Sequence, residues 1–198
     1  VNMLQGALAA AERVFALLDS AEISPDPEMP VELPKPVQGR VAFEHVRFGY
    51  SPEAPLMRDV SLVAEPGQKV AIVVATGAGK TTLINLLMRF YEVDGGRITL
   101  DGVDTRQLRR RDLRREFGMV LQDAWLFEGS IRDNIAYAQD NLPEEKIIAA
   151  ARSASVDSFI KTLPGGYDFE LSTGAENISQ GQRQLLTIAR AMASDPEI

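Results

Sequence analysis

The stretch KVAIVVATGAGKTT at residues 69–82 decides the fold of this chain. Residues 69–74 are mostly β-branched and apolar, which predicts a strand that is buried on both faces. A glycine-rich turn follows, and residues 81–90 have the spacing of a helix. Glycines let successive backbone N–H groups surround a phosphate, and a helix N-terminus adds partial positive charge. The order of strand, glycine-rich turn and helix therefore predicts a phosphate-binding loop.

The candidate phosphate-binding residues are Thr76, Gly77, Ala78, Gly79, Lys80, Thr81 and Thr82. We expect Lys80 to reach the β- and γ-phosphates of a nucleotide, and the Thr81 hydroxyl to bind Mg²⁺. The alternative is a glycine-rich turn beside a surface lysine. Val74 stands where the full pattern has glycine. Valine resists the positive φ that glycine tolerates. We expect this valine to weaken nucleotide binding.

Several other segments have clear periodicity or composition. Apolar residues at helical spacing predict an amphipathic helix at 3–18, and repeated prolines predict an extended connector from Ser20 to Pro36. The remaining predicted elements are strands at 41–48, 60–64, 97–100 and 117–121 and helices at 143–153 and 181–193. The predicted fold class is α/β, with an antiparallel β part near the N-terminus, a phosphate-loop core with a parallel sheet, and a helical subdomain after Gln122.

Composition excludes several classes of function. The chain has 198 residues, a formal net charge of −7 and no cysteine. The negative charge argues against a nucleic acid partner, and the lack of cysteine excludes disulfide scaffolds and thiolate metal sites. No apolar run approaches the ~20 residues that a membrane span needs. Because the chain opens at Val1 and stops just after Asp195-Pro196, we expect both ends to be cuts through a longer protein.

Three further motifs accompany the phosphate-binding loop. They read FGY at 48–50, LQD at 121–123 and ENISQGQRQ at 176–184. Together they resemble the ATP-binding cassette (ABC) ATPase family, and specifically the exporters whose membrane and ATPase domains share one chain. The last motif resembles the signature sequence of that family in a variant with glutamine at its centre. The resemblance covers nearly every residue and implies ATP and Mg²⁺ as ligands.

The resemblance also implies a role for each motif. Tyr50 would stack on the adenine base, and Gln122 would be a catalytic and coupling residue that touches Mg²⁺ or the attacking water. The residues that would face an ATP held by a second subunit are Ser179, Gln180, Gly181 and Gln182. The alternative for Ser179 is an ordinary helix cap. Ala175 stands where such exporters often have glycine.

The implied domains are the end of a transmembrane-domain helix at 1–19, a Pro-rich linker at 20–39 and an ABC nucleotide-binding domain at 40–198. The expected partners are a second nucleotide-binding domain and the transmembrane domain of the same chain, at the cytoplasmic face of the cell (inner) membrane. In the family, the Walker B strand with its carboxylates and the switch histidine follow the signature, and this chain stops before them. We therefore expect the intact parent to hydrolyse ATP, and residues 1–198 alone to be inactive and unstable.

Some alternatives stay open at the level of sequence. A degenerate or non-hydrolytic ABC subunit would explain Val74, and a soluble ABC ATPase of DNA repair or translation would lack the N-terminal helix and linker. The cargo of an exporter is a lipid, a drug-like molecule or a peptide. We interpret His45 as structural and the arginines at 109–115 as a solvated helix face paired with acids. Trp125 faces either a membrane-domain partner or the core.

Overall fold

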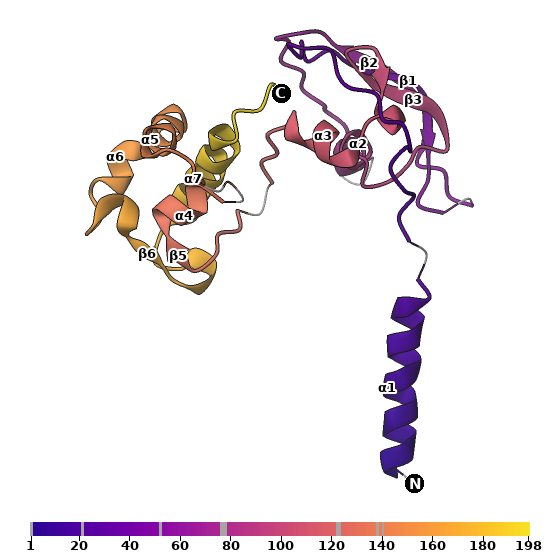
Figure 1. The fold of residues 1–198 in the computed structure, drawn as a ribbon, viewed down its shortest axis with the longest axis horizontal. Coiled ribbons are helices and arrows are strands. Elements are labelled where there is room, and N and C mark those ends of the chain that lie inside the picture. The colour runs from indigo at the N-terminus through magenta and orange to yellow at the C-terminus, as the bar shows by residue number, and fades with distance from the viewer. Residues whose placement is uncertain are drawn as a thin grey trace.

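The computed structural model describes residues 2–20, 22–51, 53–75, 79–121, 124–137, 139 and 141–198. Figure 1 shows a lobe built on a β-sheet, a helical lobe, and an N-terminal helix that stands apart from both. The helices expected at 3–18, 143–153 and 181–193 and the strands expected at 41–48, 60–64 and 97–100 are confirmed, with ends that shift by a few residues.

The first lobe is a four-stranded antiparallel sheet in the order β2-β1-β3-β4. Its strands are β1 (Val41–Phe48), β2 (Met57–Ala64), β3 (Gly95–Leu100) and β4 (Val103–Asp104). Two helices, α2 (Lys80–Leu87) and α3 (Arg110–Arg115), add Leu86 and Leu113 to the buried cluster of this sheet. Because β1 lies between β2 and β3, its register aligns Val41 with Ala64 on one side and Leu100 on the other.

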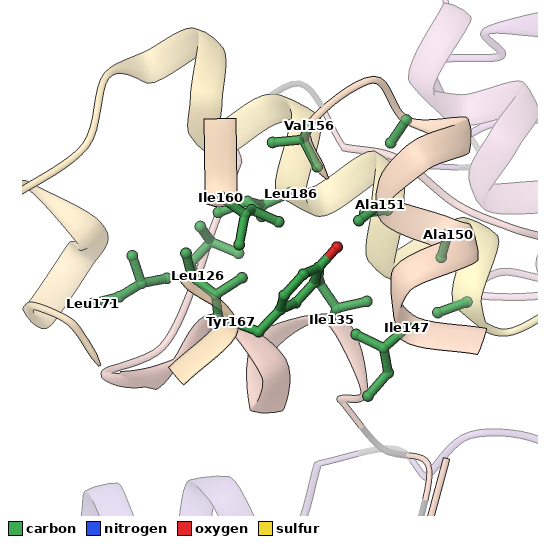
Figure 2. Packing of buried hydrophobic residues seen from close by; sticks show 14 of the residues in the cluster. Leu126, Ile135, Ile147, Ala150, Ala151, Val156, Ile160, Tyr167, Leu171 and Leu186 are labelled. Atoms are coloured by element: carbon green, nitrogen blue, oxygen red, sulfur yellow. The ribbon is translucent and has the colours of Figure 1, made fainter. Parts of the chain in front are cut away.

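The second lobe is mainly helical, as the sequence predicted beyond Gln122. It contains β5 (Gly129–Ser130), α4 (Ile131–Ile135), α5 (Glu144–Ser153), α6 (Asp157–Ile160), β6 (Glu170–Leu171) and α7 (Gln180–Ala193), with β5 antiparallel to β6. Figure 2 shows the apolar side chains that these elements bury together, among them Ile135, Ala151 and Leu186. The hydroxyl of Tyr167 donates to Asp157 Oδ1 at 2.8 Å, and burial together with this bond raises the pKa of Tyr167.

Two predicted strands do not form. Residues 69–74 and 117–121 are described but have no regular secondary structure, so the expected parallel sheet is absent from the described residues. Val73 is 88% exposed and Leu121 59% exposed. A strand that is apolar on both faces needs paired neighbours and cover on each side, and no described strand pairs with either segment. The end of the chain lies beside the second segment: Ile198 N donates to Glu116 O at 2.9 Å, and Gly118 N donates to Ile198 O at 2.8 Å.

The helix α1 (Asn2–Leu18) and the linker differ in how they relate to the first lobe. From residue 5 onward the α1 side chains are exposed, whereas the linker is held by polar contacts. Arg110 donates to Asp26 Oδ1 at 2.9 Å and to Ser24 Oγ at 2.7 Å, and Val31 N donates to Gln107 O at 2.9 Å. No helix in the described part of the chain is both long enough and apolar enough to cross a membrane.

Candidate functional site

The N-terminus of α2 is a candidate anion site. Gly79 is the N-cap residue with φ 96°, and no side chain of the described residues caps this end. The first N–H groups of a helix have no partner inside the helix, so they are available to an anion. A Cβ at Gly79 would lie 3.2 Å from Met57 Cε, and the positive φ would strain any other residue. Glycine at this position therefore allows the sharp entry into the helix.

The Lys80 side chain folds back over the segment that precedes the helix. Its Nζ donates to Val74 O at 2.7 Å and to Ala75 O at 3.3 Å. Both acceptors are neutral backbone carbonyls, so these contacts orient the ammonium group without neutralising its charge. Lys80 is exposed, as is Thr81 next to it. This geometry places a cation and a hydroxyl at the open end of α2.

Tyr50 lies beside the same helix. Its hydroxyl is 3.0 Å from Thr82 Oγ1, and Thr82 is only 4% exposed. The Tyr50 ring stands edge-on to Phe48, with centroids 5.0 Å apart, and edge-on to Tyr91 at 5.1 Å. Tyr50 nevertheless remains 57% exposed. The structure thus brings Tyr50 next to the first turn of α2 and leaves much of its surface accessible.

The signature motif begins α7 in the helical lobe. Ser179 Oγ accepts from Gln182 N at 3.3 Å, and Gln182 Oε1 accepts from Ser179 N at 2.8 Å, which together form a capping box. Ser179, Gln180 and Gly181 are exposed. Because Ser179 Oγ is an acceptor in the cap, its O–H remains a donor for another group. The cap and a ligand contact are therefore compatible.

The predicted residues fall into two separate groups. Tyr50, Gly79, Lys80, Thr81 and Thr82 belong to the sheet lobe, whereas the signature residues belong to the helical lobe (Figure 1). Thr76, Gly77, Ala78 and Gln122 lie outside the described residues. Among the residues that the structure does describe, no group of three or more His, Cys, Asp or Glu side chains could hold a metal ion.

Comparison with known proteins identifies the family. The family described as "ABC transporter" matches residues 57–198. The chain belongs to the ABC transporter family. The "Fatty acid ABC transporter ATP-binding/permease protein" of Mycobacterium tuberculosis is 55% identical over 197 residues, which cover 100% of this chain and 31% of that protein. An "ATP-dependent lipid A-core flippase" of Syntrophus aciditrophicus is 39% identical, over 100% of this chain and 32% of that protein.

A solved structure supports the same assignment. The "Structure of a bacterial Atm1-family ABC exporter with ATP bound" is 37% identical, with a TM-score of 0.84 over 97% of this chain and 34% of that chain. This chain therefore spans about a third of the length of these relatives, which are 31% to 34% covered. The likeness confirms the expected ABC ATPase fold.

At two positions, 74 and 175, this chain lacks a glycine of the ABC pattern, and the two residues differ in backbone conformation. Val74 does not have a positive φ, so the backbone strain expected there is absent. That Val74 weakens nucleotide binding stays a prediction, but backbone strain would not be the cause. Ala175 has φ 51° and is completely buried, so it adopts the left-handed conformation that glycine adopts freely. Arg183 Nη1 donates to Gly174 O at 3.2 Å and to Ala175 O at 3.4 Å, which holds this turn beside α7.

Sequence reasoning did not foresee the link between Arg190 and Asn134. Asn134 is fully buried, and its side chain bonds both backbone groups of Phe127. Arg190, on α7, donates to Asn134 O at 2.7 Å and to Trp125 O at 3.1 Å. Burial lowers the pKa of Arg190. These bonds join the segment after Gln122 to the signature helix, and no sequence signal pairs residues so far apart.

Three other expectations about side chains have mixed outcomes. His45 is on the surface, where its Nδ1 lies 3.0 Å from Asp59 Oδ1, in keeping with a structural role. The arginine cluster is not uniformly solvated, because Arg110 is only 8% exposed and is paired with Asp26 and Glu92. Trp125 is 62% exposed, so it does not belong to the core within the described residues.

Proposed function

We propose that this chain is the nucleotide-binding domain of an ABC exporter, which binds ATP with Mg²⁺ in a larger protein that hydrolyses ATP to move its cargo. The observation that carries the proposal is the arrangement at α2: Lys80 lies at an uncapped helix N-terminus, and Tyr50 is joined to the same helix through Thr82. The helix N-terminus and Lys80 suit the phosphates. The exposed ring of Tyr50 suits the base.

The donor set around Thr81 fits Mg²⁺ bound together with a nucleotide. Thr81 is exposed and supplies one hydroxyl oxygen, and the described residues offer no carboxylate cluster. Mg²⁺ commonly binds few protein ligands and completes its shell with phosphate oxygens and water. When bound, it would neutralise charge on the phosphate oxygens. Lys80 and the N–H groups of α2 would orient the phosphates, and Gln122 would complete the site.

We propose that the signature residues act on the site of a second copy. Ser179, Gln180 and Gly181 are exposed at the N-terminus of α7, whose first turn contains no acidic residue. Such an end attracts a phosphate. Since Lys80 is in the other lobe, an ATP molecule would be covered by the signature of a partner subunit, which is either an identical or a related chain.

The proposed domains are a transmembrane-domain end at 1–19, a linker at 20–39 and the nucleotide-binding domain at 40–198. We place the protein at the cytoplasmic face of the cell membrane, with the transmembrane domain in the same chain. A lipid is the cargo class we favour, because the relatives described above are named for fatty acids and lipid A-core. Residues outside the nucleotide-binding domain would select it.

The test compares the intact protein with its Lys80→Ala variant. Loss of a charged contact to the phosphates should weaken Mg-ATP binding about 10- to 100-fold, measured by calorimetry. Lys161→Ala is the matched control, because Lys161 is an exposed lysine that pairs with Asp157 in the helical lobe. Equal affinities of the unsubstituted protein and the Lys80→Ala variant for Mg-ATP would refute nucleotide binding at α2. Tight ATP binding by the parent without any turnover would favour the non-hydrolytic alternative.

A further inference from the structure

Tyr91 is an aromatic residue next to Tyr50 that neither the motifs nor the proposed function use. Its ring contacts Tyr50 edge-on, with centroids 5.1 Å apart and an interplanar angle of 87°. It also contacts Phe48, with centroids 5.8 Å apart. Tyr91 is 46% exposed, so burial in the core does not explain its position. The three rings form one cluster at the edge of the first lobe.

The backbone that carries Tyr91 is fixed on both sides. Arg89 is 4% exposed, and its Nη1 donates to Thr105 O at 3.0 Å and to Leu108 O at 2.9 Å. On the other side, Glu92 Oε1 accepts from Arg110 Nη2 at 2.7 Å. A side chain on a segment held in this way is a rigid support for its neighbour.

The loop after Tyr91 also holds the residue before Tyr50. Asp94 Oδ2 accepts from Gly49 N at 2.9 Å, and Asp94 N donates to Arg47 O at 2.8 Å. Thr82 anchors the far end of the Tyr50 side chain through the hydroxyl. Tyr50 is therefore held at its backbone and its hydroxyl, and Tyr91 and Phe48 set the tilt of the ring.

We propose that Tyr91 is a positioning residue, which holds the Tyr50 ring in the orientation that stacks on the base of the bound nucleotide. The inference rests on the proposed function of Tyr50. Tyr91 acts through Tyr50. It raises the affinity for a triphosphate that carries a base and does not change the affinity for tripolyphosphate, which has no base. Edge-on aromatic pairs contribute enough to make the expected change in affinity about 2- to 10-fold.

The experiment measures the affinity of the intact protein for two probes, Mg-ATP and Mg-tripolyphosphate, which has the phosphates but no base. Tyr91→Leu should weaken ATP binding about 2- to 10-fold and leave tripolyphosphate binding unchanged. Tyr91→Phe keeps the ring and should restore the affinity of the parent. Phe90→Leu is the matched control, because Phe90 is 41% exposed and lies under the Arg114 guanidinium instead of beside Tyr50.

The outcomes separate this inference from the proposed function. In a Tyr50→Leu background, Tyr91→Leu should have no further effect on ATP affinity, and an undiminished effect there would overturn the inference. Equal losses for both probes would show a structural role and would also overturn it, as would unchanged ATP affinity. If Tyr91→Leu is unstable in a thermal melt, Tyr91→Met replaces it. If Lys80→Ala binds both probes like the parent, the proposed function fails irrespective of Tyr91.

Discussion

The carboxylate of Asp26 is expected to hold the linker on the first lobe, and Asp26→Asn tests this. One oxygen, Oδ1, accepts from Arg110 Nη1 at 2.9 Å and from Arg110 N at 3.2 Å. Arg110 is almost fully buried, so water cannot replace the lost charge around most of its surface. Asparagine has nearly the same shape but no charge, which isolates the electrostatic contribution.

The size of the expected effect follows from the degree of burial. Removing one partner of a buried ion pair costs about 3–5 kcal/mol. The Asp26 side chain is 40% exposed, and the Glu92 carboxylate remains 2.7 Å from Arg110. Asparagine also keeps one accepting oxygen. These factors reduce the expected loss to about 1–2 kcal/mol in the free energy of releasing the linker.

Native-state hydrogen exchange measures this local opening in the intact protein. The amide of Val31 donates to Gln107 O, so it exchanges when the linker leaves the lobe. A loss of about 1–2 kcal/mol should speed its exchange about 5- to 30-fold. Glu145→Gln, at an exposed position on α5, is the control and should leave Val31 unchanged. A change of less than about 3-fold in Asp26→Asn would refute the electrostatic hold on the linker.

Two other predictions concern the signature helix and the sheet. Ser179→Asp should keep the helix cap and the melting temperature, because aspartate caps as well as serine, but its negative charge should abolish ATP-dependent dimerisation measured by light scattering. Ser179→Asn retains the cap without the charge, and equal loss in both variants would contradict charge repulsion. Burial alone would raise the pKa of Asp104, but hydrogen bonds from Arg106 outweigh it and keep the pKa below its ordinary value. A lowered pKa stabilises the fold at pH above the unfolded value of about 3.9, and this stability is lost as pH falls through the folded pKa. Acid unfolding should therefore show a smaller pH dependence in Asp104→Asn, and identical acid transitions would exclude this contribution.

Local patterns in the sequence predicted the helices and the strands of the antiparallel sheet. The apolar spacing predicts α1 and α7, alternation predicts β1, and the turns at Pro66-Gly67 and Gly95-Gly96 mark β2 and β3. Residues 69–74 have an equally strong pattern but form no strand, because a run that is apolar on both faces depends on pairing across the sheet. The apolar pattern shows that residues 69–74 need paired strands and cover on both faces, and the described residues do not supply them.

The candidate site also contains residues that a local sequence pattern predicts and contacts that no local pattern predicts. Glycine at 79 and lysine at 80 follow from the chemistry of phosphate binding, and the position of both at the start of α2 agrees with the motif. The contacts of Tyr91 with Tyr50 and of Arg110 with Asp26 had no local signal, since the second pair is 84 residues apart in sequence. The sequence does not distinguish the arginines at 109–115 from one another, and only the packing shows that Arg110 is buried.

Two side chains of the site at α2, Lys80 and Tyr50, are already paired within the chain, and this determines which contacts the proposed ligand would replace. The Lys80 ammonium binds the carbonyl oxygens of Val74 and Ala75, and the Tyr50 hydroxyl pairs with Thr82. Phosphate oxygens would replace neutral carbonyls around Lys80, so the ammonium would gain the attraction of an anionic acceptor in addition to its hydrogen bonds. The exchange is therefore favourable. Because the acceptor at Val74 is a backbone oxygen and this residue has no positive φ, we expect the valine to affect binding through the position of that oxygen and not through backbone strain.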